Sequence, residues 1–432
     1  MTVKRIVSLA LAALMALTLV GCAAVAPANE PEAEATEQPV DPTGSYVNAA
    51  GEAVPLKIYN TSLVLPSPLT YDSRYTMYAN AFASRLTYVL EQKNGKDWSG
   101  VYSPLSLQII LQLLANGADE ETSRALIDAV CSGMSRQDVN VSTAKLMNIF
   151  NNGRGVSLNN AVVASKAFQI NKDYADTVGS YYNAAIGALD FLNVDDAMRA
   201  INGWVSENTG GMIDELIKDL STDTVMVLLS TLYFDQEWEV PFIATRNLTE
   251  FFGANGTEWV SMMQRSDEFL YGSFPEGEMA VLPYKNSSYA MAVILPDKEL
   301  SPAEAVKHLI GLWSDCELKS GKVSMPKVEL DTELDVLELA DELGISEAIR
   351  GNFNGLLAGG EAEVSAILQG AKIIVSEAGT TAAAATAAEL NKGVPAPNGF
   401  ELVCNRPYAM VIFNNDTGVV MFVSIVNSIG QN

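Results

Sequence analysis

Few residues of this chain have the type and spacing needed for nucleophilic chemistry. Its 432 residues include one histidine, so any nucleophile activated by histidine would depend on His308, and no G-x-S-x-G string is present. His308 lies in a helical-looking segment and is expected at the surface. Ser142 and Lys145 have the S-x-x-K spacing of one class of serine hydrolases, with Ser206-Glu-Asn208 downstream. This string is expected about once by chance in a chain of this length, and no Lys-Thr-Gly accompanies it.

The stretch from Ala371 to Pro407 is the most informative part of the chain. It begins with a strand-like run, Lys372–Val375, and continues into a tract of Ala and Thr, 380–388, that has no charged side chain before Glu389. Turn-forming residues follow, and a second apolar region begins at Phe400. Composition alone permits a linker or an Ala-rich helix. The strand-like segments on both sides favour a loop with a function inside a compact domain.

The tract also resembles a known motif. The run Glu377-Ala-Gly379-Thr380-Thr381-Ala382-Ala383-Ala384 is similar to the hinge of the serpins, the serine protease inhibitor family, whose reactive loop begins Glu-x-Gly-Thr-x-Ala-Ala. About eight further segments between residues 78 and 427 resemble the family in order and spacing. They include Ser103-Pro-Leu-Ser106, Ile201-Asn-Gly-Trp-Val205, Trp238–Phe242 and Asn405-Arg-Pro-Tyr408.

This resemblance implies an α+β serpin fold, with helices packed on a large central mixed β-sheet, smaller sheets, and an exposed reactive loop at about 377–399. It implies an irreversible suicide-substrate inhibitor of serine proteases that is not an enzyme, needs no cofactor or metal, and acts as a monomer. The partner would be a trypsin-, chymotrypsin- or subtilisin-, or elastase-like protease. The alternative is a non-inhibitory serpin-fold surface protein that binds a partner without trapping it, and the S-x-x-K hydrolase is a distant third.

The loop composition favours the inhibitor. Insertion of the loop as an extra central strand would turn alternate side chains inward. Counted from the hinge, the inward positions are all small: Thr380, Ala382, Ala384, Thr386 and Ala388. A charged residue, a proline or a large aromatic on that face would block insertion, and none occurs there.

The sequence does not decide which of several neighbouring peptide bonds the protease would attack. The family spacing from Glu377 places the attacked carbonyl at Gly393, before Val394, and a loop one residue shorter places it at Lys392. Lys392 would suit a trypsin-like protease, whereas Leu390 would suit a chymotrypsin- or subtilisin-like one. A proline directly after the attacked carbonyl is rejected because its ring crowds the site, which disfavours cleavage after Val394.

The family also has a polar cluster beneath the main sheet, to which Ser103 and Ser106 correspond. The other two positions depart from the family: Ser230 stands where Asn is usual and Gln369 where His is usual. Both replacements are polar, so we expect them to hydrogen-bond the two serines in a rearranged cluster.

The amino-terminal segment indicates export. Residues 1–21 combine Lys4 and Arg5 with an apolar run, and Leu19-Val-Gly-Cys22 resembles the lipobox of bacterial lipoproteins. We therefore expect a lipid anchor on Cys22, an acidic Pro/Ala/Glu tether over 22–70 and the folded domain over 71–432. The expected location is the extracellular face of a bacterial membrane, lipid-anchored, or the medium after secretion.

The net charge of −25 limits the possible partners. Nucleic acids and anionic membranes are bound through basic patches, and acidic residues are spread along this whole chain. We therefore expect no nucleic-acid partner, and contact with a membrane only through the lipid.

Local patterns predict several elements. Apolar residues at helical spacing over 78–90 predict a first helix, and Ser103 followed by Pro104 predicts the start of a second, buried one. The apolar run Val225–Phe234 predicts a strand covered on both faces. Two hairpins are expected, with turns at 285–288 and 414–418.

Overall fold

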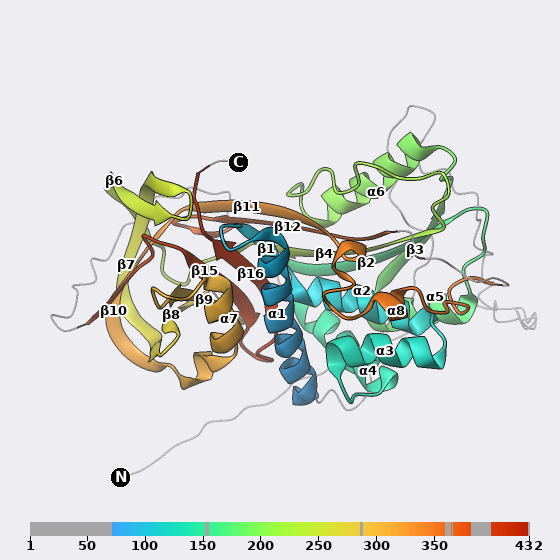
Figure 1. Ribbon diagram of the computed structural model, residues 1–432, viewed down its shortest axis with the longest axis horizontal. Coiled ribbons are helices and arrows are strands. Elements are labelled where there is room, and N and C mark those ends of the chain that lie inside the picture. The colour runs from blue at the N-terminus through green and yellow to red at the C-terminus, as the bar shows by residue number, and fades with distance from the viewer. Residues whose placement is uncertain are drawn as a thin grey trace, which may run out of the picture. The chain divides into compact units, whose positions relative to one another are not determined.

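The structure, a computed structural model, describes residues 71–151, 155–285, 288–358, 364, 366–381 and 399–430. The α+β class expected from the sequence is confirmed, with helices packed against a large mixed sheet and beside a second sheet (Figure 1). The helices are α1 (Ser73–Asn94), α2 (Pro104–Gly117), α3 (Glu120–Cys131), α4 (Arg136–Asn151), α5 (Lys172–Tyr182), α6 (Val194–Asn208), α7 (Pro302–Leu309) and α8 (Ser346–Ile349), with short 3₁₀ turns η1 (Leu312–Asp315) and η2 (Leu337–Leu339).

Among the described residues the strands form two sheets. The seven-stranded sheet has the order β3-β2-β4-β12-β13-β5, with β11 paired to the other edge of β12. Its strands are β2 (Val156–Ser165), β3 (Ala184–Leu189), β4 (Met226–Phe234), β5 (Gln236–Glu237), β11 (Val328–Asp335), β12 (Ala366–Val375) and β13 (Gly379–Thr380).

The nine-stranded sheet has the order β1-β16-β15-β9-β8-β7-β10-β14, with β6 on β7. Its first strand, β1, pairs with its last, β16. The strands are β1 (Gly100–Tyr102), β6 (Ile243–Gly253), β7 (Gly256–Phe274), β8 (Gly277–Pro283), β9 (Tyr289–Pro296), β10 (Glu317–Pro326), β14 (Phe400–Val403), β15 (Tyr408–Asn414) and β16 (Val420–Val426).

The locally predicted elements are confirmed. Helix α1 contains the predicted 78–90 segment, and α2 begins at Pro104 after Ser103, whose hydroxyl accepts a hydrogen bond from the Ser106 amide at 3.1 Å. This cap satisfies one of the amides that the first turn of a helix leaves unpaired. Strands β8–β9 and β15–β16 are the two predicted hairpins.

Strand β4 is buried on both faces because its side chains alternate. Val227 and Leu229 pack with Trp204 of α6 in one apolar cluster, whereas Leu228 belongs to the larger core on the opposite side. In Figure 1, α6 lies over one face of the seven-stranded sheet and α2 lies against the other. The sheet is therefore the middle layer of this half of the domain.

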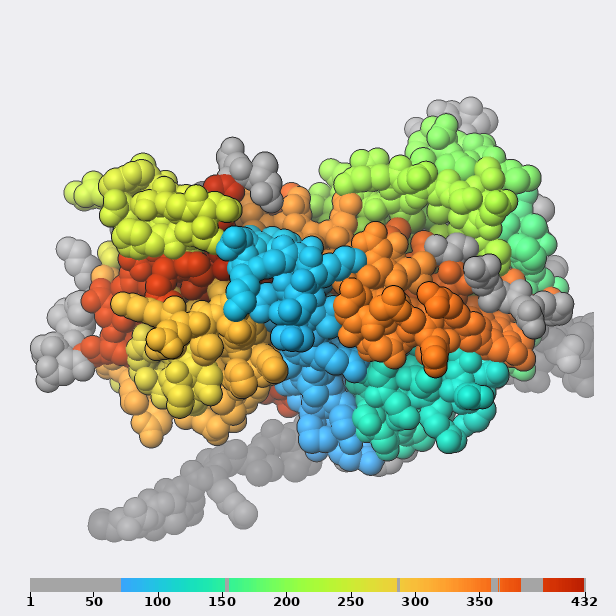
Figure 2. Space-filling model, viewed as in Figure 1, coloured from blue at the N-terminus to red at the C-terminus, as the bar shows by residue number. Residues whose placement is uncertain are grey.

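The segment around α8 is distant from α3 in the sequence but packs beside it at the surface (Figure 2). The Asp119 amide donates to the Asn352 carbonyl at 2.9 Å, and the Asn352 amide donates to the Thr122 hydroxyl at 3.2 Å. These bonds fix the segment around α8, shown in orange, against the cap of α3.

Candidate functional site

The pairing between the two central strands of the seven-stranded sheet is incomplete. Strands β4 and β12 run parallel, yet they pair only where Ala366–Leu368 meets Val227–Leu229. Beyond this point β4 continues to pair with β2, and β12 with β11, on their outer edges. Within the described residues, the facing edges of Ser230–Phe234 and Gln369–Ile373 have no strand between them. We call these two edges the unpaired edges; at about 3.3 Å per residue they are about 17 Å long.

Strand β13 lies between β12 and β5, at the end of the unpaired edges nearest Val375. Thr380 pairs with Val375 of β12 and with Gln236 of β5, antiparallel in both cases. Because β13 runs antiparallel to β12, a strand that continued in the direction of β13 would run along the unpaired edges. Gly379 and Thr380, which the sequence predicts to be part of a hinge, form this two-residue strand.

The Thr380 side chain is buried beneath this strand. Its residue is 1% exposed, and its hydroxyl shares a 2.5 Å hydrogen bond with the hydroxyl of Tyr284. Burial raises the pKa of Tyr284 well above its usual value, and the hydrogen bond with Thr380 opposes this shift only partly. The phenol is therefore neutral, and the pair is a neutral hydrogen bond within the core. The Thr380 side chain thus faces the core in the uncut chain.

Trp238 holds the residues that precede β13. Its indole stacks on Tyr284, with ring centroids 4.5 Å apart, and its Nε1–H donates to the Ser376 carbonyl at 2.9 Å. Its backbone amide donates to the Ala378 carbonyl at 2.9 Å. Trp238 thus fixes the turn between β12 and β13 through both its side chain and its backbone amide.

Gly379 is required by a close approach of backbone atoms. A Cβ added at Gly379 would lie 2.1 Å from the carbonyl oxygen of Gln236, which is too close for any side chain. Glu377, two residues earlier, holds this turn mainly through its backbone, since its carbonyl accepts a hydrogen bond from the Phe242 amide at 2.9 Å. The Glu377 carboxylate also lies 3.4 Å from the Lys327 ammonium, in a partly exposed ion pair that contributes little.

The predicted polar cluster is only partly connected. The Gln369 side chain donates to the Ser103 carbonyl at 2.5 Å and accepts from the Ser103 amide at 3.3 Å. It therefore ties an unpaired edge of β12 to the start of α2. The expectation for Ser230 is wrong: the Ser230 and Ser106 hydroxyls are buried and have no hydrogen-bond partner among the described residues.

The two ends of the expected reactive loop are anchored in different sheets. Thr381 follows β13 in the seven-stranded sheet, whereas Gly399 precedes β14, which pairs in parallel with β10 of the nine-stranded sheet. Phe400 stacks on Tyr271 with ring centroids 4.0 Å apart. Several predicted site residues lie outside the described residues: Cys22, Ala382, Ala383, Ala384, Leu390, Lys392, Gly393 and Val394.

The residues of the alternative serine-hydrolase site do not lie together. Ser142 and Lys145 are buried in α4, within the core on one side of the seven-stranded sheet, whereas Ser206 belongs to α6 on the other side. Ser206 donates to the Asp214 carboxylate at 3.0 Å. His308 is exposed in the last turn of α7. The residues that a serine hydrolase would need therefore do not converge.

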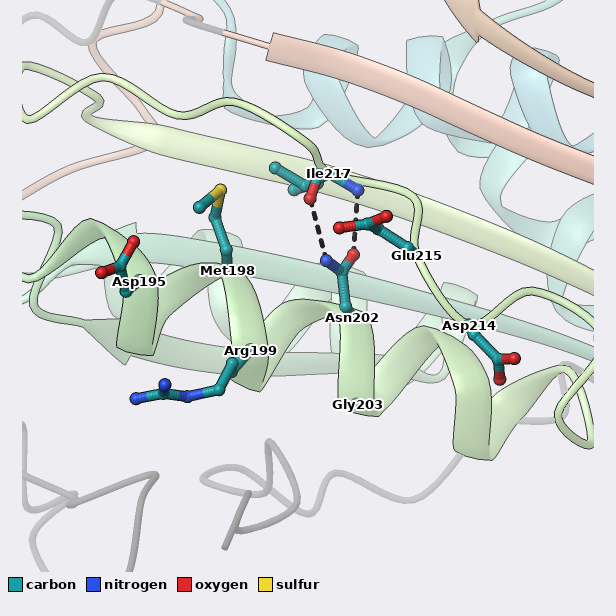
Figure 3. A pocket seen from close by; sticks show the side chains of 8 residues that line it. All are labelled: Asp195, Met198, Arg199, Asn202, Gly203, Asp214, Glu215 and Ile217. Atoms are coloured by element: carbon teal, nitrogen blue, oxygen red, sulfur yellow. Dashed lines mark hydrogen bonds between the residues drawn. The ribbon is translucent and has the colours of Figure 1, made fainter. Parts of the chain in front are cut away.

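An open pocket of about 460 Å³ lies beside α6 (Figure 3). Asn202 holds its wall: the side-chain oxygen accepts from the amides of Leu216 and Ile217 at 2.9 and 2.8 Å, and the side-chain nitrogen donates to the Ile217 carbonyl. Asn202 thus uses its side-chain oxygen and one N–H to fix the segment after α6, which secures the layer over β4.

Two further properties concern the described residues. They contain no group of three or more His, Cys, Asp or Glu side chains that could hold a metal ion. Among their helices, none has the length and apolar character needed to cross a membrane.

Comparison with known proteins identifies relatives over most of the chain. The family model described as "Serpin (serine protease inhibitor)" matches residues 77–429. An uncharacterized serpin-like protein of Methanosarcina mazei is 26% identical over 367 residues, covering 80% of this chain and 85% of the relative. Plasminogen activator inhibitor 1 of Bos taurus is 26% identical over 353 residues, covering 77% and 87%. The crystal structure of the thermophilic serpin tengpin in its native state aligns with a TM-score of 0.75 and 26% identity, covering 85% of this chain and 97% of tengpin.

Proposed function

Because the chain belongs to the serpin family, whose members are in general protease inhibitors and not enzymes, we propose that it traps a serine protease by inserting its cleaved reactive loop into the seven-stranded sheet. One observation carries this proposal. Buried Thr380 stands at the head of the unpaired edges of β4 and β12, aligned antiparallel to β12. A strand continuing from it has a pairing partner on each side.

The chemical step is acyl transfer to the protease. The protease serine hydroxyl adds to the attacked loop carbonyl, an ester bond forms as the peptide bond breaks, and the serine proton ends on the leaving amine. The leaving segment stays attached through β14, while the acylated segment stays attached through β13. The two ends can then separate because they are anchored in different sheets.

Insertion supplies the free energy that drives the trap. Each new backbone hydrogen bond contributes a net ~0.5 to 1.5 kcal/mol, so about ten bonds along the unpaired edges release on the order of 10 kcal/mol. The small inward residues that follow Thr380 in the sequence present no charge or bulk that would oppose entry.

The test is covalent trapping. The protein is mixed separately with trypsin, chymotrypsin, subtilisin and elastase, and with each protease after its active serine has been blocked. We expect a denaturant-resistant complex with at least one active protease and with no blocked one. Cleavage of the loop without any complex would contradict the proposal and favour the binding-only alternative.

The same reaction identifies the attacked bond. The carboxyl-terminal fragment, separated by denaturation, begins at Gly393 if Lys392 is attacked, at Val394 if Gly393 is attacked, and at Asn391 if Leu390 is attacked. Its mass therefore distinguishes the three positions and indicates the class of protease.

The proposed location rests on the amino-terminal sequence. Cleavage before Cys22 and lipidation of its thiol would place the inhibitor outside a bacterial membrane on an acidic tether. Mass spectrometry of the mature protein should find a lipidated Cys22 at its amino terminus. An unmodified Cys22 within a longer or differently cut chain would contradict this location.

A further inference from the structure

Strand β6 lies at an edge of the nine-stranded sheet (Figure 1). It pairs with β7 and, within the described residues, with no other strand. The Phe252 amide points away from β7 and donates to the Asn405 carbonyl at 2.8 Å. Because successive residues of a strand direct their backbone groups to alternate edges, the amides and carbonyls of Leu248 and Glu250 also point outward. These groups therefore form an open edge of the sheet.

Apolar side chains gather on the solvent-facing side of the same hairpin. Glu250 lies opposite Trp259, so their side chains share a face of the sheet. Leu248 and Phe252 lie two residues before and after Glu250, on that same face. Leu248, Phe252 and Trp259 are 58%, 49% and 65% exposed. On the opposite face Phe251 is fully buried, so this side of the hairpin is an exposed apolar surface beside the open edge.

The charges along this edge are self-complementary. Arg246 and Glu250 lie two residues before and after Leu248, and neither has an ion-pair partner within the described part of the chain. If two copies of the edge pair antiparallel about Leu248, Arg246 of each copy lies opposite Glu250 of the other. Opposite charges in such cross-strand positions stabilise the pairing. A register centred on Glu250 would instead place two carboxylates against each other.

We infer that β6 is a self-association surface, at which a second copy of this chain adds its own β6 antiparallel about Leu248. This pairing supplies partners for the outward backbone groups of Leu248 and Glu250 and places the apolar side chains of the two copies side by side. Each copy uses the same edge, related by a two-fold axis, so the assembly closes as a dimer. The surface belongs to the nine-stranded sheet, so this inference is independent of the proposed inhibitory function.

The contact is short, which makes the dimer weak and reversible. At one end the Asn405 carbonyl already occupies the Phe252 amide. At the other end β6 departs from regular pairing between Ala244 and Leu248. Only the segment around Leu248 is left to pair, and an interface of this length lies at the small end of specific protein contacts.

Charge exchange tests the register. The full chain is followed by sedimentation equilibrium at physiological ionic strength, where we expect a reversible monomer–dimer equilibrium. Arg246→Glu or Glu250→Arg places like charges opposite each other twice and should raise the dissociation constant of the dimer about tenfold. The double variant Arg246→Glu/Glu250→Arg restores both opposite-charge pairs and should restore the dimer. Equal melting temperatures of the monomers would show that these exposed substitutions leave the fold intact.

Disulfide trapping tests the same register by distance. Leu248→Cys places two thiols directly opposite each other across the two-fold axis, so mild oxidation should link the two copies. Phe252→Cys is the matched control, because it is similarly exposed but would lie roughly 26 Å along the strands from its counterpart, at about 3.3 Å per residue. The unmodified protein gives the background from its own cysteines.

Three results would overturn the inference. The first is a protein that stays monomeric up to about 100 μM, a concentration at which even weak specific dimers form. The second is a dimer that both single charge variants leave unchanged, since it would use another surface. The third is equal cross-linking of Leu248→Cys and Phe252→Cys. None of these results depends on whether the protein traps a protease.

Discussion

The hydroxyl groups of Tyr284 and Thr380 lie 2.5 Å apart in the core, although the two residues are 96 positions apart in the sequence. This bond fixes β13 at the end of the unpaired edges. Because both residues are at most 1% exposed, no water replaces a lost partner easily.

Tyr284→Phe should therefore destabilise the intact protein. It leaves the Thr380 hydroxyl buried without its partner, which costs about 1 to 2 kcal/mol in the free energy of unfolding. The measurement is urea unfolding at neutral pH. Tyr408→Phe is the matched control, because the Tyr408 hydroxyl is buried without a hydrogen-bond partner among the described residues and its removal should be neutral or stabilising. Equal losses for both variants would contradict the assigned bond.

The polar cluster gives a second pair of variants. Gln369→Ala removes both hydrogen bonds to Ser103 and leaves the Ser103 amide buried, so we expect a loss of about 1 to 3 kcal/mol. Ser230→Ala removes a hydroxyl that has no partner, so stability should stay level or rise. Urea unfolding compares the two. If Ser230→Ala cost as much as Gln369→Ala, the cluster would be connected differently.

Thr380→Arg should convert the inhibitor into a substrate. A guanidinium at this position loses its hydration without a charged partner, which costs several kcal/mol and expels β13 from its place between β12 and β5. Denaturing gels should show cleaved protein in place of complex, whereas Thr380→Ser, which keeps a small hydroxyl side chain, should still form complex. An unchanged yield of complex for Thr380→Arg would exclude entry through this position.

Cleavage between Ala388 and Gly393 should raise the melting temperature strongly. A cut separates the anchors at Thr381 and Phe400, so the acceptor edges of β4 and β12 can be filled, and the resulting ~10 kcal/mol is comparable to the stability of an ordinary domain. Melting curves before and after limited proteolysis, with the cut mapped by mass, test this. A nicked protein that melts at or below the temperature of the intact one would contradict insertion.

Local sequence patterns predicted those helices and strands whose ends and buried faces depend on interactions between residues close in the sequence. Ser103 and Pro104 marked the start of α2 because a cap and a proline act within one turn, and the apolar run of β4 indicated burial on both faces. The prediction of a hinge at Glu377–Ala384 rests on a family resemblance, since small side chains fit many environments.

The contacts that position the hinge could not be predicted in this way. Nothing in the spacing of Tyr284 or Trp238 indicates that both lie beneath β13, because those contacts depend on the pairing of distant strands. The Gln369 bonds and the isolation of Ser230 likewise depend on side-chain reach across the sheet. The positive φ of Thr381 carries no signal in the sequence, since threonine ordinarily avoids that conformation.

The pairing of β1 with β16 constrains how the protein is made. Gly100 lies opposite Ile425, so the nine-stranded sheet cannot be completed until almost all of the chain has left the ribosome. Contacts of such long sequence separation form slowly. The two edges of β4 and β12, in contrast, are present in the chain before β16 is synthesised, and an exposed edge accepts strands from other chains. Completion of β16 does not cover these edges, because they belong to the other sheet, so they can accept a strand from another chain both during synthesis and after folding.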